Sequence, residues 1–138
     1  MACTRTYVGL CIYSPDIGPA EISARLGVEF SKGFDRDPNS RYRSHRDHNF
    51  WLWSTQGSLA STDHMDHLNA LFARFEGAEA AIEALRASGC TTSISCYWDS
   101  NGQGGPSLDI KTIKKLAEFG ADIWWDVYFD ETKSEDCA

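Results

Sequence analysis

Hydrophobic and polar residues alternate strictly along the first segment of the chain, residues 5–13. Val8, Leu10 and Ile12 fall on one side of this segment, whereas Tyr7 and Tyr13 fall on the other. A period of two residues is typical of a β-strand with one face against a core. By the same criterion we predict three more strands, at residues 49–55, 91–98 and 121–129.

Between these strands the apolar residues recur at the three- and four-residue spacing of amphipathic helices. The pattern predicts a short helix at 19–26, two helical segments between residues 61 and 88 with a break at Gly77, and a last helix at 109–119. In the last helix we expect four residues to face inward, namely Ile110, Ile113, Leu116 and Ala117. Residues 29–48 show no sustained period, which predicts a long loop; loops of this length are usually functional or mobile.

The order of the predicted elements is strand, helix, strand, two helical segments, strand, helix, strand. With four strands and so few helices, this order favours an α+β two-layer sandwich: a four-stranded, mainly antiparallel sheet with the helices on one face, ferredoxin-like or related. We expect a single domain over residues 1–129, followed at 130–138 by an acidic, disordered tail.

The charge balance narrows the choice of partner. The 138-residue chain has a formal net charge of −7, with 20 acidic against 13 basic residues. DNA, RNA and anionic membranes attract Lys-rich and Arg-rich surfaces, so this balance argues against all three and favours a basic protein partner. No apolar run approaches the roughly 20 residues of a membrane span, and the five cysteines include no Cys-x-x-Cys pair. We therefore expect a cytoplasmic protein with reduced thiols.

Several short motifs, in their order along the chain, resemble a known family. They are Leu26-Gly27 at the end of the first helix, Ser31-Lys32-Gly33, the strand around Trp51, the Gly104–Leu108 loop, Phe119–Ile123 and Asp126–Tyr128. In this arrangement the chain resembles the domain of unknown function 4279 family of small bacterial proteins, from about residue 5 to 129. One departure is Glu29-Phe30, where a proline would be expected after the first helix. The resemblance supports the fold and implies no activity, cofactor or partner.

The pair His64 and His67 is the candidate for metal chemistry. Two histidines three residues apart share one side of a helix, and neutral imidazoles are common zinc ligands. His45 and His48 would complete a site if the loop at 29–48 folded over the helix. This reading makes the protein a metal-dependent hydrolase. The alternative is that the histidines belong to the amphipathic start of a helix, with His64 in its apolar stripe, and we prefer it.

Other catalytic or cofactor motifs are weak. The glycine-rich loop 101–107 lies between a strand and a helix, where phosphate-binding loops occur, but it lacks their Lys-Ser/Thr ending and the dinucleotide pattern fails at Ser107. The chain has no Gly-x-Ser-x-Gly elbow and no protease-like cysteine motif. We expect no cofactor and no catalytic residues.

The most informative feature is aromatic. If the aliphatic residues of the strands face the helices, several aromatic residues share the opposite, open face of the sheet: Tyr7, Tyr13, Tyr97, Trp124 and Tyr128, with Trp51 and Trp53 expected to join them. Exposed aromatic clusters mark interfaces. A second copy of the chain, another protein or stacked bases would each fit such a face. Alternatively, the loop at 29–48 folds across the sheet and buries these aromatics.

These observations favour a non-enzymatic protein-interaction domain, regulatory or toxin-neutralising in one version, that binds a partner protein or a second copy of itself. The alternatives are the metal-dependent hydrolase using His64 and His67, and a single-stranded nucleic-acid binder.

Overall fold

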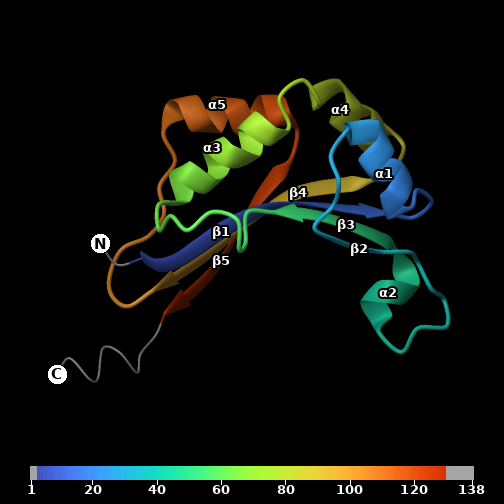
Figure 1. Ribbon diagram of the computed structural model, residues 1–138, viewed down its shortest axis with the longest axis horizontal. Coiled ribbons are helices and arrows are strands. Elements are labelled where there is room, and N and C mark those ends of the chain that lie inside the picture. Colours follow the sequence, from blue (N-terminus) through green and yellow to red (C-terminus); the bar gives the residue numbers. More distant parts are fainter. Residues whose placement is uncertain (1–2, 130–138) are drawn as a thin grey trace.

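The computed structural model describes residues 3–129, which form one five-stranded sheet and five helices (Figure 1). The strands are β1 (Cys3–Ser14), β2 (Lys32–Phe34), β3 (Asn49–Ser54), β4 (Thr91–Ser100) and β5 (Asp122–Phe129). The helices are α1 (Pro19–Leu26), α2 (Arg43–Asp47), α3 (His64–Arg74), α4 (Glu79–Ala87) and α5 (Ile110–Phe119). The predicted α+β class is confirmed, and the tail at 130–138 lies outside the described residues.

The sheet is mixed, and its strands follow the order β2-β3-β1-β4-β5. The pairs β2–β3, β3–β1 and β1–β4 are antiparallel, whereas β4 and β5 are parallel. A parallel pair needs a crossover connection, and α5 supplies it between β4 and β5. The expected four-stranded, mainly antiparallel sheet is therefore only roughly right. The element order also differs from the β-α-β-β-α-β order of a ferredoxin-like fold.

The missed strand, β2, and the short helix α2 both lie within residues 29–48, which we predicted to be a loop. Three and five residues are too short for either a two-residue or a 3.6-residue period to be recognised. β2 forms because residues 32–34 pair with the outer edge of β3. The sheet thus ends on a very short strand on this side, which leaves little unpaired backbone there.

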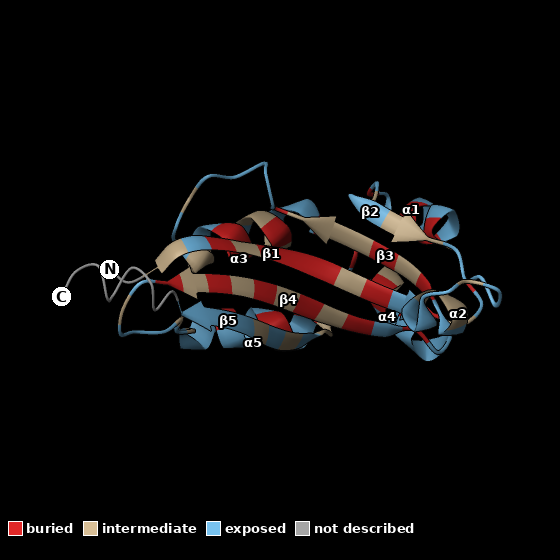
Figure 2. Ribbon diagram, turned by 90° about the horizontal axis from the view of Figure 1, so that it is seen from below, coloured by how far each residue is buried: buried red, intermediate tan, exposed pale blue. Residues whose placement is uncertain are grey.

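Four helices, α1, α3, α4 and α5, cover one face of the sheet, as predicted (Figure 1). The other face carries no helix except α2, which lies below one end of it (Figure 1). Figure 2 shows this uncovered face, where buried positions concentrate along β1 and β4 and exposed ones along β5. We call it the open face.

The core lies between the sheet and the four covering helices. The aliphatic side of β1, with Val8, Leu10 and Ile12, is completely buried and meets Leu68 and Leu71 of α3. A buried aliphatic side chain contributes about 1.5–3 kcal/mol relative to an exposed one. The alternation seen in the sequence of β1 therefore orients the sheet: its aliphatic side faces the helices and its tyrosine side faces away.

Helix boundaries follow local signals. Pro19 starts α1, where its missing N–H is not needed, and Gly27 ends it in the left-handed conformation, at a φ of 70°. Asp109 caps α5 by accepting a hydrogen bond from the Thr112 backbone N–H at 2.8 Å. The hydrogen bonds from Thr112 lower the pKa of the Asp109 carboxyl.

The orientation predicted for α5 is wrong in part. Leu116 is buried as expected, but Ala117 is exposed, and so are Ile110 and Ile113, at 74% and 52%. The inward side of α5 is formed instead by Thr112, Leu116 and Phe119. Across residues 3–129, the helices are too short and too polar to cross a bilayer.

Candidate interaction surface

Three tyrosine rings pack side by side on the open face. Cross-strand pairing places Tyr7 of β1 opposite Tyr97 of β4, and their rings stack with centroids 4.6 Å apart and planes 17° from parallel. The ring of Tyr128, on β5, lies 5.2 Å from that of Tyr97. We call Tyr7, Tyr97 and Tyr128 the tyrosine cluster. Because α1, α3, α4 and α5 cover the opposite face and α2 lies at the other end of this one, the cluster presents its rings outward, and Tyr128 is 49% exposed.

Charged groups of both signs border the tyrosine cluster. The Arg5 guanidinium carbon lies 5.4 Å from the ring centroid of Tyr7 and 5.8 Å from that of Tyr97. The hydroxyl of Tyr97 lies 3.5 Å from a carboxylate oxygen of Asp99, and that of Tyr128 lies 3.4 Å from one of Asp126. Aromatic faces attract cations, and a cation over these rings is also drawn to the two carboxylates.

The same carboxylates affect the ionisation of the phenols. The pKa of Tyr97 is raised, mainly by partial burial and then by the negative charge of Asp99. The pKa of Tyr128 is raised as well, chiefly by Asp126. Both phenols therefore stay protonated at neutral pH, and neither is prepared to act as a base or a nucleophile.

Trp124 adds a fourth aromatic side chain to this end of the open face. It pairs in register with Ser95 on β4, on the same side of the sheet as the tyrosine cluster, and is 68% exposed. It thus shares the open face with the tyrosine cluster, with Asp126 between it and Tyr128 on β5. Of the aromatic residues that the sequence assigned to an exposed surface, Tyr7, Tyr97 and Tyr128 lie ring to ring, and Trp124 lies on the same face.

The middle of the open face is lined by small side chains. Gly9 and Cys11 of β1 lie beside Ser93 and Ser95 of β4. Gly9 is covered by Leu52 from β3, since a Cβ built at Gly9 would be 2.8 Å from the Leu52 Cδ1. Burial raises the pKa of the Cys11 thiol to about 11, so this thiol is protonated and poorly nucleophilic at neutral pH.

The opposite end of the open face is covered in part by the segment 35–48. The ring of His45, on α2, stacks on Phe34 with centroids 3.8 Å apart, and Phe34 lies 5.1 Å from Phe50. His48 lies edge-on to Tyr13 at 6.0 Å. The segment thus packs on the end of the sheet formed by β2, β3 and Tyr13. The segment contacts Tyr13 but leaves it 37% exposed, and the tyrosine cluster lies outside it, so the alternative that this loop buries the aromatics does not hold.

Hydrogen bonds fix this segment on the sheet edge. The Asn49 side chain accepts from the Arg36 backbone N–H at 2.6 Å and donates to the Ser14 carbonyl at 3.1 Å. The Asp37 backbone N–H donates to the His45 carbonyl at 2.7 Å. Because these bonds connect the segment to β1 and β3, the segment forms part of the surface at one end of the open face.

Trp51 and Trp53 do not lie on the open face, and their predicted placement is wrong. In the β1–β3 register they pair with Ile12 and Leu10, whose side chains face the helices. Trp51 is fully buried, donates from Nε1 to the Ser23 hydroxyl at 2.9 Å and packs edge-on against Phe75.

Phe50 and Leu52 take their place on the open face, which the sequence pattern did not predict. In residues 50–53 both alternating sets are large and apolar, so periodicity could not tell which set faces the helices. Only the pairing register with β1 decides it.

His67 is a structural residue. It is completely buried, with its Nδ1 2.6 Å from the Thr55 hydroxyl and its Nε2 2.8 Å from the Ser61 carbonyl oxygen. A carbonyl only accepts, so Nε2 carries the proton and donates it, and Nδ1 accepts from Thr55. Both ring nitrogens thus have partners within the protein. His67, and not His64, occupies the buried stripe of α3, in contrast to our expectation.

His64 is engaged elsewhere. Its Nε2 donates to the Ser107 carbonyl at 2.6 Å, which fixes the glycine-rich loop to the start of α3, and its ring packs on Trp125. His45 and His48 lie on the open-face side of the sheet, away from α3. In the part of the chain that the structure describes, no three His, Cys, Asp or Glu residues are grouped to hold a metal ion. The geometry therefore does not favour the metal-dependent hydrolase.

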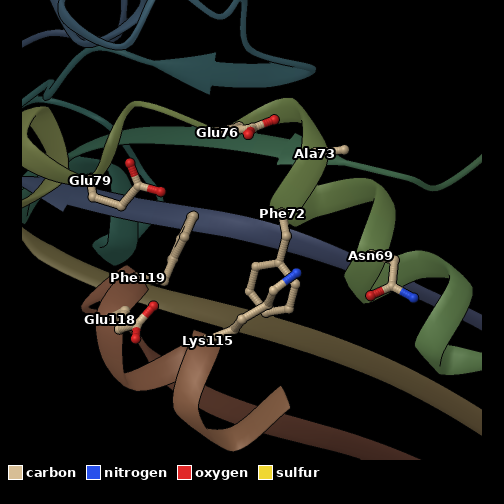
Figure 3. Close-up of a pocket in the computed structure, with 8 residues that line it drawn as sticks. All are labelled: Asn69, Phe72, Ala73, Glu76, Glu79, Lys115, Glu118 and Phe119. Carbon is tan, nitrogen blue, oxygen red and sulfur yellow. The ribbon is translucent and has the colours of Figure 1, made fainter. Parts of the chain in front are cut away.

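A cleft of about 450 Å³ opens on the helix side, between α3, α4 and α5 (Figure 3). Its floor is the aromatic pair Phe72 and Phe119, and the ammonium of Lys115 lies 5.5 Å from the Phe72 ring centroid. Three glutamates border it: Glu76, Glu79 and Glu118. The eight lining residues include no serine, cysteine or histidine, so the cleft holds no Ser–His or Cys–His pair.

The fold and the surface together define a class of protein: a small α+β domain whose sheet is covered by helices on one side and presents aromatic side chains on the other. Residues 4–130 match the model of a family described as a domain of unknown function, DUF4279. The chain belongs to this family, as the resemblance of its motifs indicated. No curated protein and no solved structure matches the chain.

Proposed function

We propose that this protein is a non-enzymatic interaction domain that binds a basic protein partner through the tyrosine cluster and Trp124 on its open face. The observation that carries this proposal is the group of packed rings of Tyr7, Tyr97 and Tyr128 on the sheet face that α1, α3, α4 and α5 leave uncovered. Tyrosine and tryptophan are enriched at protein interfaces because they combine a large contact area with a polar group.

The charges around the cluster support a partner that presents Arg or Lys side chains. Arg5 lies over two of the rings, so the cluster already binds a guanidinium of its own chain. Tyr128 and Trp124 extend the same surface toward β5, and Asp99 and Asp126 lie beside it. A partner cation there would contact an aromatic face and a carboxylate together.

Base stacking by single-stranded nucleic acid would use the same rings but fits this surface less well. Phosphates next to the bases would approach Asp99 and Asp126, and the chain as a whole carries a net charge of −7. A regulatory or toxin-neutralising role is one form that binding of a basic protein can take.

The test uses a deca-arginine peptide, with oligothymidine and deca-glutamate as comparison ligands, in calorimetric titrations at low and at physiological salt. We expect the peptide to bind at low salt and its affinity to fall as salt is raised. The double variant Tyr97→Ser/Tyr128→Ser should weaken binding at least fivefold. Tyr42→Ser, a change at an exposed tyrosine on the segment 35–48, is the matched control and should bind like the wild type.

Equal binding by the double variant and the wild type would refute the assignment of the surface. Absence of deca-arginine binding at low salt would refute the preference for a basic partner. Binding of oligothymidine, lost in the double variant, would replace the protein partner with nucleic acid.

A further inference from the structure

The exposed apolar side chains gather along one edge of the molecule. Nine large hydrophobic residues are exposed among residues 3–129. Six of them belong to the adjacent elements α5 and β5: Ile110, Ile113, Trp124, Val127, Tyr128 and Phe129. Seen from the open face, β5 forms the outer edge of the sheet and α5 runs behind it (Figure 2).

Among residues 3–129, nothing covers the outer edge of β5. It is eight residues long and, within the described chain, pairs only with β4. Its other side therefore presents a row of free backbone N–H and C=O groups. Proteins usually protect such edges with lysine, proline or a very short strand, as at the opposite edge, β2. The sequence of β5 contains neither lysine nor proline, and its two charges, Asp122 and Asp126, both lie on the open face.

The helix side of this edge is apolar as well. Val127 and Phe129 pair in register with Trp98 and Ser100, whose side chains are buried toward the helices, yet Val127 and Phe129 are themselves 55% and 50% exposed. On α5, Lys115 points toward α3, over the ring of Phe72. Ile113, two residues earlier, lies about 200° around the helix from Lys115 and thus on the outer flank beside β5.

We infer that this edge joins two copies of the chain, with β5 pairing antiparallel to β5 of the second copy about a two-fold axis normal to the sheet. Such pairing is self-complementary and satisfies the free backbone groups of both strands. The same axis keeps the helices of both copies on one side and brings the outer flank of α5 against its counterpart. A second copy supplies both required parts, a strand edge and an apolar helix flank, whereas an extended peptide supplies only the first.

The size of the surface agrees with a dimer. Large side chains have areas of about 200 Å² each, so the six residues expose roughly 700 Å² per protomer. A standard interface buries about 800 Å² per partner, which the backbone of the two paired strands would complete. Pairing of this kind makes one ten-stranded sheet and leaves Tyr7 and Tyr97 uncovered. Trp124 and Tyr128 belong both to this edge and to the proposed partner surface, whereas Ile113 and Val127 belong to the dimer edge alone.

The test is the solution mass by light scattering on a size-exclusion column, over a series of protein concentrations up to about 100 µM. We expect twice the chain mass of 15.4 kDa. Two single variants, Ile113→Lys and Val127→Lys, should each raise the dissociation constant at least tenfold. Both residues are exposed within one chain, so the monomer fold is retained. Tyr42→Lys, at the opposite end of the sheet, is the control and should dimerise normally.

Salt distinguishes this interface from the partner-binding surface. Two copies with a charge of −7 repel each other, so salt should strengthen the dimer, whereas it weakens binding of a basic peptide. Hydrogen exchange of the amides of β5 should slow as the concentration of the wild type rises. A monomer at every concentration, or exchange in β5 that is independent of concentration, would overturn the inference. So would a dimer that survives Ile113→Lys and Val127→Lys but is lost in Tyr7→Ser, because that dimer would pair the open faces.

Discussion

Replacement of the buried His67 by leucine separates a structural histidine from a metal ligand. The imidazole connects two parts of the chain, since Nε2 donates to the Ser61 carbonyl and Nδ1 accepts from the Thr55 hydroxyl. Leucine is similar in size, keeps the site apolar and makes neither hydrogen bond.

The size of the stability loss depends on whether Thr55 and Ser61 find new hydrogen-bond partners in His67→Leu. The Thr55 hydroxyl can turn to the Val8 carbonyl oxygen, 3.2 Å away, so it stays paired. The Ser61 carbonyl loses its donor, and an unsatisfied, partly buried group costs about 1–3 kcal/mol. We therefore expect His67→Leu to lower the free energy of unfolding by about 2 kcal/mol.

Urea denaturation followed by circular dichroism measures this loss. With a slope of about 1–3 kcal/mol per molar urea for a small protein, the midpoint should fall by roughly 1 M with the slope unchanged. His64→Leu is the matched control. It also removes one bond to a carbonyl, but at a partly exposed site where water can replace the donor, so its midpoint should move much less.

Two results would refute this reasoning. One is an unchanged midpoint in His67→Leu. The other is a wild-type protein whose midpoint falls on addition of EDTA by as much as it falls on substitution, since that would identify His67 as a ligand of a stabilising metal.

Two further substitutions test the packing of the open face and the state of its thiol. Gly9→Ala places a Cβ 2.8 Å from the Trp53 carbonyl oxygen and from the Leu52 Cδ1, so the free energy of unfolding in urea should fall by about 1–3 kcal/mol. The control is Gly102→Ala, whose Cβ has no atom within 4 Å and should leave stability unchanged. Equal urea midpoints for the two variants would contradict the close packing at Gly9. The pKa of the Cys11 thiol is raised from 9.0 to about 11 by burial, so its contribution to stability is fully present below pH 9 and is lost as the pH rises from 9 to about 11. Between pH 9 and 11 the melting temperature of Cys11→Ala should fall less than that of the wild type. An equal fall of the melting temperature in both proteins would show that the thiol is not shielded from water.

The family and most of the secondary structure could be predicted from the sequence. Alternation along β1 and β4 predicted their location to within two residues and their buried side, because one alternating set holds the aliphatic residues, Val8, Leu10 and Ile12 in β1 and Ile94 in β4. The helix boundaries at Pro19, Gly27 and Asp109 could be predicted because caps and turns depend on the residue itself.

The candidate surface could be predicted only in part. Tyr7, Tyr97, Trp124 and Tyr128 share the open face because each falls on the tyrosine side of a strand whose orientation the pattern determines. Trp51 and Trp53 were placed on the wrong face, since β3 has two apolar sides. Its orientation comes from hydrogen-bonded register with β1, a long-range property that no local period encodes.

The sequence by itself thus determined where the strands and helices form and which sides of β1 and β4 are buried, because these depend on residues close in the chain. Only the tertiary structure decided which strands pair, with β5 parallel to β4 at one edge of the sheet and β2 beside β3. It also decided the orientation of α5, in which Ile110 and Ile113 face outward. Segments far apart in sequence compete for the same partners, and the total burial and backbone pairing of the whole chain select among them. The exposed edge of β5, on which the dimer depends, is a result of that selection.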